Sequence, residues 1–280
     1  MRTKRLYFFV LLFLAFAGMS AQTPADSLTL VSARWDVSSP RDGIVRRCAA
    51  FSSLYGGPQY VSLVAVSSEA RLRATIVLSD TLAPVSTIAQ AAGAVTAVNG
   101  SYFDVRRGNS VCFLQLGGVV KDTTTAGEFR LRVNGAVRIR RGHMDIVPWD
   151  RQTEKAYRSS DDILASGPLL LREGRTCSWA SCDSSFVHTA HPRSAVAVAA
   201  DGTVWFVTAD GRAPGRAAGM TIPQLAHLIR VLGGRDALNL DGGGSTTLWM
   251  DGEVVNHPSD NRRFDHEGER RVPDIICFRP

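Results

Sequence analysis

Short β-type runs joined by two-residue turns dominate the chain after residue 57. Four dipeptides stand between such runs: Gly117-Gly118, Asn134-Gly135, Asp201-Gly202 and Asp251-Gly252. Dipeptides of this kind tolerate positive φ and fit the tight turns of β-hairpins. The pattern predicts an α+β fold, with a core of mostly antiparallel or mixed β-sheet and a few helices.

Two segments have the apolar spacing of helices. The clearer one begins at Thr221, where Gln224 completes a capping box, and ends at Gly233-Gly234. Its apolar face consists of Leu225, Leu228, Ile229 and Leu232. A second helix is predicted from Ser86 to Ala92, where Gly93 stops it.

Each predicted helix is followed by a short apolar strand that runs into a polar, glycine-containing segment. The first strand, residues 94–98, leads into Asn99–Asp104, and the second, residues 237–240, leads into Asp241–Ser245. Functional residues are often placed at strand ends, where a rigid sheet holds them. We therefore expect binding or catalytic residues in both segments.

The first 21 residues have the features of a secretory signal peptide. Basic residues at Arg2, Lys4 and Arg5 precede an apolar run over residues 6–17, and small residues follow up to Ala21. The apolar run is too short to span a bilayer, so we expect no stable membrane insertion after cleavage. The protein is predicted to be exported to the periplasm or secreted. Residues 22–57 read as a loosely structured lead-in segment that packs on one catalytic domain, residues 58–280.

Charge and cysteine content narrow the function classes further. The formal charge of +6 falls to +3 without the leader, and no basic stripe interleaved with aromatic residues is present. A nucleic-acid partner is therefore not expected. Of the five cysteines, Cys177 and Cys182 flank a short polar loop and are the natural candidates for a disulfide bond in an exported protein.

The glycine run at Gly242-Gly243-Gly244 is the most informative string in the sequence. Three glycines let the backbone approach a ligand closely and turn amide groups toward an anion. Asp241 precedes the run and Ser245 follows it, which indicates a sugar or phosphate site. The run is not a P-loop, because no Gly-Lys-Ser/Thr string follows it.

Two predicted hairpins bring further polar residues to such a site. If Ala200 and Thr203 close the Asp201-Gly202 turn, Arg193 lies opposite Asp210 and His191 lies opposite Arg212. The Asp251-Gly252 turn returns Asn256 beside the residues that follow the glycine run. A solvated cross-strand ion pair would explain the first cluster equally well.

Other sites are not indicated. The sequence has no Gly-x-Ser-x-Gly, no His-Glu-x-x-His and no cysteine spacing typical of zinc. No cofactor is expected, although Asp104, Asp210 and Asp241 could share a divalent cation.

The ordered set of motifs resembles the phosphodiester glycosidase family. Its strings are Asn99–Asp104, Gly167–Leu170, His191–Val196, Asp210–Arg212, Gly219–Thr221 and Ala237–Ser245, and the resemblance runs from about Tyr60 to the C-terminus. Mild departures stand at Ser101-Tyr102, where the family often has Gly-Phe, and at Ser194, where Thr is frequent.

The resemblance implies a surface cavity and hydrolysis of a sugar-1-phosphate diester to free sugar and phosphomonoester. The substrate would be a phosphorylated glycan or sugar phosphodiester. A non-catalytic glycan-binding protein and a phosphodiesterase that breaks the P–O bond remain alternatives. The expected catalytic residues are Asp241, Asp210, Asp104 and Arg193. The expected substrate-binding residues are Asn99, Gly100, Tyr102, Phe103, His191, Arg212, Asn239, Gly242, Gly243, Gly244, Ser245 and Asn256.

Overall fold

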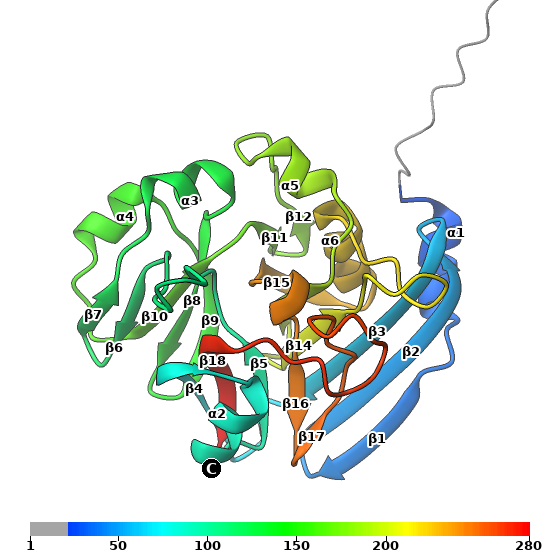
Figure 1. The fold of residues 1–280 in the computed structure, drawn as a ribbon, viewed down its shortest axis with the longest axis horizontal. Coiled ribbons are helices and arrows are strands. Elements are labelled where there is room, and N and C mark those ends of the chain that lie inside the picture. The colour runs from blue at the N-terminus through cyan, green and yellow to red at the C-terminus, as the bar shows by residue number, and fades with distance from the viewer. Residues whose placement is uncertain (1–21) are drawn as a thin grey trace, which may run out of the picture.

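The computed structural model describes residues 22–280, and the predicted signal peptide lies outside this range. Three antiparallel sheets and six α-helices make up the described part (Figure 1). The predicted α+β class is confirmed. Among the described residues, no helix is both long and apolar enough to cross a membrane.

The largest sheet has eight strands in the order β1-β2-β3-β14-β13-β15-β11-β12. Their bounds are β1 Asp36–Arg41, β2 Ile44–Leu54, β3 Gly57–Val66, β14 Val204–Ala209, β13 Arg193–Ala199, β15 Gly234–Asn239, β11 Leu169–Arg172 and β12 Arg175–Thr176. Helix α6 (Ile222–Val231) packs against β15 and β11 of this sheet. Both α1 (Pro24–Val31) and α5 (Ser184–His188) contact α6.

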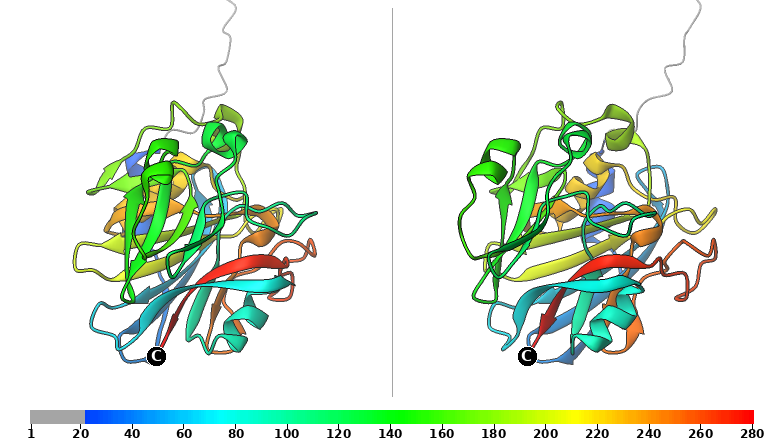
Figure 2. Two further views of the ribbon diagram at one scale, coloured as in Figure 1. Left: turned by 90° about the vertical axis from the view of Figure 1, so that its left-hand side faces the viewer. Right: turned by 60° about the vertical axis from the view of Figure 1, so that its left-hand side comes forward.

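Two five-stranded sheets complete the architecture. One has the order β7-β6-β10-β8-β9, with bounds β7 Val119–Asp122, β6 Leu114–Leu116, β10 Asp162–Ser166, β8 Gly135–Arg140 and β9 His143–Pro148. Helices α3 (Ala126–Leu131) and α4 (Arg151–Ala156) lie at one end of it (Figure 1). The other has the order β17-β16-β5-β18-β4, with bounds β17 Glu253–Val254, β16 Leu248–Met250, β5 Thr96–Asn99, β18 Val272–Arg279 and β4 Arg73–Ala83. The turned views in Figure 2 show its long strands β4 and β18 running side by side.

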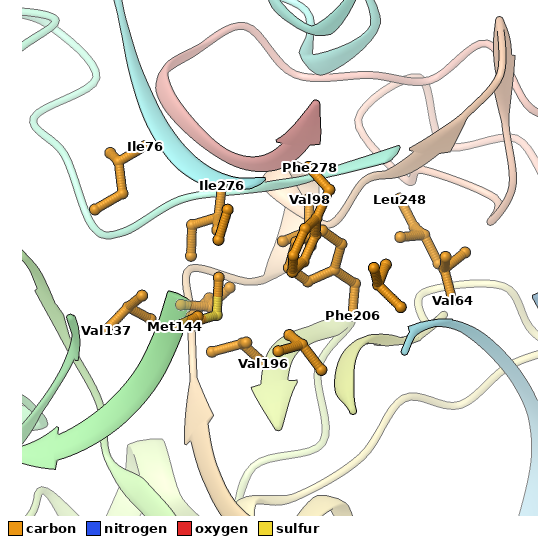
Figure 3. Packing of buried hydrophobic residues seen from close by; sticks show 14 of the residues in the cluster. Val64, Ile76, Val98, Val137, Met144, Val196, Phe206, Leu248, Ile276 and Phe278 are labelled. Atoms are coloured by element: carbon orange, nitrogen blue, oxygen red, sulfur yellow. The ribbon is translucent and has the colours of Figure 1, made fainter. Parts of the chain in front are cut away.

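The main hydrophobic core lies where the three sheets face one another. Phe206 of the eight-stranded sheet packs against Phe278 of β18, with ring centroids 5.6 Å apart. Val137 and Met144 reach the same cluster from β8 and β9 (Figure 3). Because apolar faces of all three sheets are buried together, the polar strand ends are held by one rigid framework.

Both predicted helices are confirmed. Helix α6 begins after Thr221, whose hydroxyl accepts a hydrogen bond from the Gln224 amide, while the Gln224 side chain accepts one from the Thr221 amide. The second helix is α2 (Val85–Ala91), which contacts β18 and β5. The capping box could be predicted from the sequence because it depends only on residues three positions apart.

The interpretation of residues 22–57 as loosely structured is wrong. They form α1 and the strands β1 and β2 of the eight-stranded sheet. Asp42-Gly43 joins these strands in a two-residue turn, the same signal that was recognised elsewhere. Asp26 then fixes α1 to the sheet, since its carboxylate accepts a hydrogen bond from the Tyr55 amide at 2.9 Å.

The predicted turns are partly right. Gly117-Gly118 joins β6 to β7, and Asp251-Gly252 joins β16 to β17. The turn predicted at Asn134-Gly135 is wrong, because Gly135 begins β8 and the hairpin turn lies at Arg141-Gly142. The predicted disulfide bond is also not formed, since Cys177 and Cys182 are both free thiols.

Candidate active site

Three segments that are far apart in the sequence meet beside the glycine run. The Asp241 amide donates to the Gly100 carbonyl at 3.1 Å, and the Asn99 side chain donates to the Asp241 carbonyl at 2.8 Å. From the other side, the Gly243 amide donates to the Pro192 carbonyl at 2.8 Å. The structure thus brings together the strand ends that the sequence singled out.

Close packing explains why the run consists of glycines. A Cβ atom on Gly242 would lie 2.6 Å from the Pro192 carbonyl oxygen. Gly243 has φ +63°, and a Cβ there would lie 2.8 Å from Nη2 of Arg212. The amides of Gly242 and Gly243 are already hydrogen-bonded within the protein, to the Asp241 carboxylate and to Pro192. These two amides are therefore not free to hold a phosphate, contrary to the expectation from the sequence.

Asp241 is the carboxylate at the centre of this arrangement. The residue is partly exposed, and burial raises the pKa of its carboxyl group. The nearby Ser245 hydroxyl, the Arg132 guanidinium, the Gly242 amide and Arg270 oppose that rise. A partly exposed carboxylate held among cations can act as a nucleophile or as a base.

Arg193 does not lie opposite Asp210. The β13–β14 loop contains one residue more than a two-residue turn, so Arg193 pairs with Ala209. A shift of one residue turns side chains to opposite faces of the sheet. Arg193 is 2% exposed and donates to the carbonyl groups of Met220, Phe186 and Thr189. Burial lowers its pKa to about 10.

Arg212 forms the exposed cationic side of the site, and His191 lies half-buried near it. Arg212 has φ +59° and places its guanidinium over Gly243. His191 forms an isolated bridge with Met220 and does not pair with Arg212 as predicted. Burial lowers the pKa of His191, and the charges of Arg193 and Arg212 lower it further. Arg212 makes no ion pair with any residue in the range 22–280.

Asp210 is placed to orient a histidine and not to attack a substrate. It is 1% exposed, and its carboxylate accepts hydrogen bonds from Asn256 Nδ2 at 3.1 Å and from His257 Nδ1 at 2.8 Å. The His257 amide donates a further bond to it at 3.1 Å. Burial raises the pKa of Asp210, and the contacts with His257 oppose this. Because donors surround its buried oxygens, the structure favours an orienting role for Asp210 over the predicted role as nucleophile or base.

His257 is a further candidate catalytic residue, although from the sequence alone a lone histidine of this kind is more often a surface residue. Its ring stacks on Phe264 with centroids 3.8 Å apart and meets Tyr60 edge-on at 4.6 Å. Nδ1 faces Asp210, which leaves Nε2 for a proton transfer. The Asp251-Gly252 hairpin, which the sequence does predict, is the signal that brings this residue beside the glycine run.

Several predicted substrate-binding residues are buried framework residues instead. Asn99 and Asn256 are 0% exposed, and every polar atom of both side chains is hydrogen-bonded inside the protein. Asn239 and Tyr102 are also buried and bond to each other and to the Gly167 carbonyl. These residues hold the strand ends together and have no polar group turned toward a ligand, except the unpartnered Asn239 Oδ1.

Asp104 lies apart from this network. Its carboxylate accepts hydrogen bonds from the amides of Arg106 and Arg107 and so closes an exposed turn. The predicted catalytic role of Asp104 has no support in this placement. Phe103 forms a bridge with Ser110 at the base of the same loop. Within residues 22–280, no three His, Cys, Asp or Glu side chains come together as metal ligands, so the three aspartates do not form a shared cation site.

Arg132, Arg270 and Asp274 also surround the site and were missed. The Arg132 guanidinium stacks on the Tyr102 ring at 3.5 Å and pairs with Glu128. Arg270 pairs with Asp260 at 2.6 Å where both pack against Gly244. No local motif marks these residues, because each reaches the site from an element distant in sequence.

Comparison with known proteins relates this chain to a family of known sequence. The sequence model of the phosphodiester glycosidase family matches residues 92–279. N-acetylglucosamine-1-phosphodiester alpha-N-acetylglucosaminidase from Mus musculus is 28% identical over 228 residues, which cover 73% of this chain and 40% of the mouse protein. The chain thus spans well under half the length of that relative.

Two solved structures share the fold. The catalytic domain of the zebrafish N-acetylglucosamine-1-phosphodiester alpha-N-acetylglucosaminidase, auto-inhibited by its pro-peptide, matches with a TM-score of 0.68 at 19% identity. That match covers 87% of this chain and 85% of the zebrafish chain. A hypothetical protein from Synechocystis matches with a TM-score of 0.64 at 16% identity, over 88% and 63% of the two chains. From the match to the family model, this chain belongs to the phosphodiester glycosidase family.

Proposed function

We propose that this protein hydrolyses the glycosidic bond of a sugar-1-phosphate diester and releases free sugar and a phosphomonoester. The observation that carries the proposal is the placement of Asp241. Its partly exposed carboxylate lies within electrostatic reach of Arg132 and Arg270, while Arg212 covers the adjacent Gly243. This reaction needs a carboxylate that acts on the electron-poor anomeric carbon. It also needs cations beside that carboxylate to bind the phosphate.

The roles follow from exposure and existing contacts. Arg212 is exposed and free of ion pairs with described residues, so it would bind the phosphate of the substrate. Buried Arg193 would contribute positive charge to the site, and its hydrogen bonds would keep the Thr189 and Met220 carbonyl groups in place. Asp241 would attack the anomeric carbon or remove a proton from the attacking water.

Proton transfer to the leaving group is a modest requirement, because a phosphomonoester departs readily. The imidazolium form of His257 would supply it from Nε2–H, while Nδ1–H donates to the Asp210 carboxylate and fixes the ring. In the overall reaction the C–O bond to the sugar breaks with its electrons on the phosphate, and water provides the new hydroxyl group of the sugar.

Substrate class and location are part of the proposal. The name of the mouse relative indicates an N-acetylglucosamine phosphodiester, and we infer a glycan phosphodiester for this chain as well. Export to the periplasm or secretion stays a prediction from the first 21 residues, and no nucleic acid is expected as a partner.

Hydrolysis of a GlcNAc-phosphate-mannose diester in ¹⁸O-labelled water tests the proposal. Label in the sugar supports cleavage of the C–O bond, and label in the phosphate would instead indicate a phosphodiesterase. Asp241→Asn should reduce kcat by about 10³-fold or more with little change in Tm, whereas Asp42→Asn at an exposed turn should change neither. Retention of an intact diester by the wild-type protein would favour a glycan-binding protein.

A further inference from the structure

Asp274 is a buried carboxyl group that the proposed reaction does not use. It lies on β18 with 0% exposure, and its Oδ1 accepts a hydrogen bond from the Ser101 amide at 3.0 Å. Oδ2 has no hydrogen-bond partner within the described residues. A buried carboxylate without a cation or a full set of donors is costly, so this group needs an explanation.

Asp274 is joined to Asp241 through a single residue. The Gly100 amide donates to the Asp274 carbonyl at 3.0 Å, and the Gly100 carbonyl accepts from the Asp241 amide at 3.1 Å. A Cβ on Gly100 would lie only 1.7 Å from Asp274 Oδ1. Asp274 therefore holds the Gly100-Ser101 turn on one side, and that turn holds Asp241 on the other.

The charged groups around Asp274 are acidic. Asp241 faces it from the segment after β15, and Asp122 acts on it from β7. The packed neighbours on β4 and after β5 are Leu78, Gly100 and Ser101, none of which titrates. Burial raises the pKa of Asp274 to about 7, the Ser101 amide opposes the rise, and the two acids add to it.

We propose that Asp274 is a positioning residue for Asp241: its neutral carboxyl group fixes the Gly100-Ser101 segment that holds Asp241, and its ionisation disfavours a negative charge on Asp241. This inference rests on the proposed function only for its effect on turnover. Two carboxyl groups in one poorly solvated region do not ionise independently, because the first charge disfavours the second. A charge on either carboxyl group therefore favours the protonated form of the other.

Carboxyl ¹³C NMR of aspartate-labelled protein tests the coupling without any substrate. We expect the Asp274 resonance of the folded wild type to titrate near neutral pH and to shift down in Asp241→Asn by about one pH unit. A midpoint near 4 in the wild type, or one that is unchanged in Asp241→Asn, would overturn the proposal. Because both measurements keep Asp274, they do not depend on how its variants fold.

The pH dependence of kcat/KM adds the functional readout. An ionisation near pH 7 should limit the activity of the wild type on its alkaline side and should be absent in Asp274→Asn. Asp236→Asn is the matched control, since Asp236 is also buried but is paired with Arg172 and Arg235, and it should leave the profile unchanged. Activity of Asp274→Asn with an unaltered alkaline limb would contradict the proposal. Lack of turnover by the wild type with NMR coupling intact would reject the proposed function alone.

Discussion

Gly100→Ala is predicted to be among the most destabilising single-methyl additions near the site. Gly100 does not have a positive φ, so backbone strain is not the reason for glycine there. The added Cβ would lie 1.7 Å from Asp274 Oδ1, and contact at about 3.0 Å requires the atoms to separate by 1.3 Å. That movement breaks the hydrogen bond from the Ser101 amide to a fully buried carboxyl group. Overpacking costs about 1–3 kcal/mol, and the lost buried hydrogen bond costs about as much again. We therefore expect Gly100→Ala to lower the free energy of unfolding by about 2–6 kcal/mol.

Equilibrium unfolding in urea, followed by circular dichroism, measures this loss. Gly127→Ala in α3 is the control, because its nearest neighbour would be Thr125 Oγ1 at 3.8 Å, and alanine there should stabilise the helix by up to about 1 kcal/mol. Asp274→Ala removes the colliding carboxyl group, so the double variant should lose at least about 2 kcal/mol less than the sum of the single variants. Additive losses of stability, or a cost below about 1 kcal/mol for Gly100→Ala, would show that the contact with Asp274 Oδ1 is not the reason for glycine at position 100.

Three further outcomes are expected. Because the pKa of Asp274 is raised to about 7, its contribution to the free energy of unfolding is most favourable below about pH 4 and is lost, by up to about 4 kcal/mol, as pH rises to about 7. Chemical denaturation at several pH values should show this loss of stability in the wild type and not in Asp274→Asn. His257→Gln should lower kcat by about 10²-fold and leave KM nearly unchanged in steady-state assays of the diester, and an equal rise in KM would indicate a binding role. Arg212→Ala should raise KM for the diester by about tenfold or more with little effect on Tm, and a loss of Tm would show that Arg212 supports the fold.

Local patterns predicted much of the fold. The capping box of α6 and the two-residue turns at Gly117-Gly118 and Asp251-Gly252 depend on residues within a few positions of each other. Residues 22–57 were misjudged because their many turn formers obscured the β2 strand, which is long and only partly buried. Its place in the sheet depends on pairing with β3, a tertiary contact that outweighs weak local preference.

The sequence predicted which segments meet at the site more accurately than it predicted what each side chain does there. The glycine run, the Asn99 segment and the start of β13 do meet, because the motifs stand at strand ends of one framework. Which side chains face a ligand depends on strand register, and one extra residue in the β13–β14 loop moved Arg193 away from Asp210. Arg132 reaches the site from the end of α3, which no spacing in the sequence could reveal.

Burial raises the pKa of both Asp210 and Asp241. The two residues still have different roles, because their contacts differ. Asp210 is 1% exposed and receives three hydrogen bonds from the Asn256-His257 segment, so its carboxyl group is committed to holding that segment. Asp241 is partly exposed, and within its own segment it accepts a bond from the Gly242 amide. When two carboxyl groups have such different surroundings, the surroundings indicate which role each group has. It follows that Asp210→Asn should impair proton transfer through His257, whereas Asp241→Asn should remove the reaction at the anomeric carbon itself.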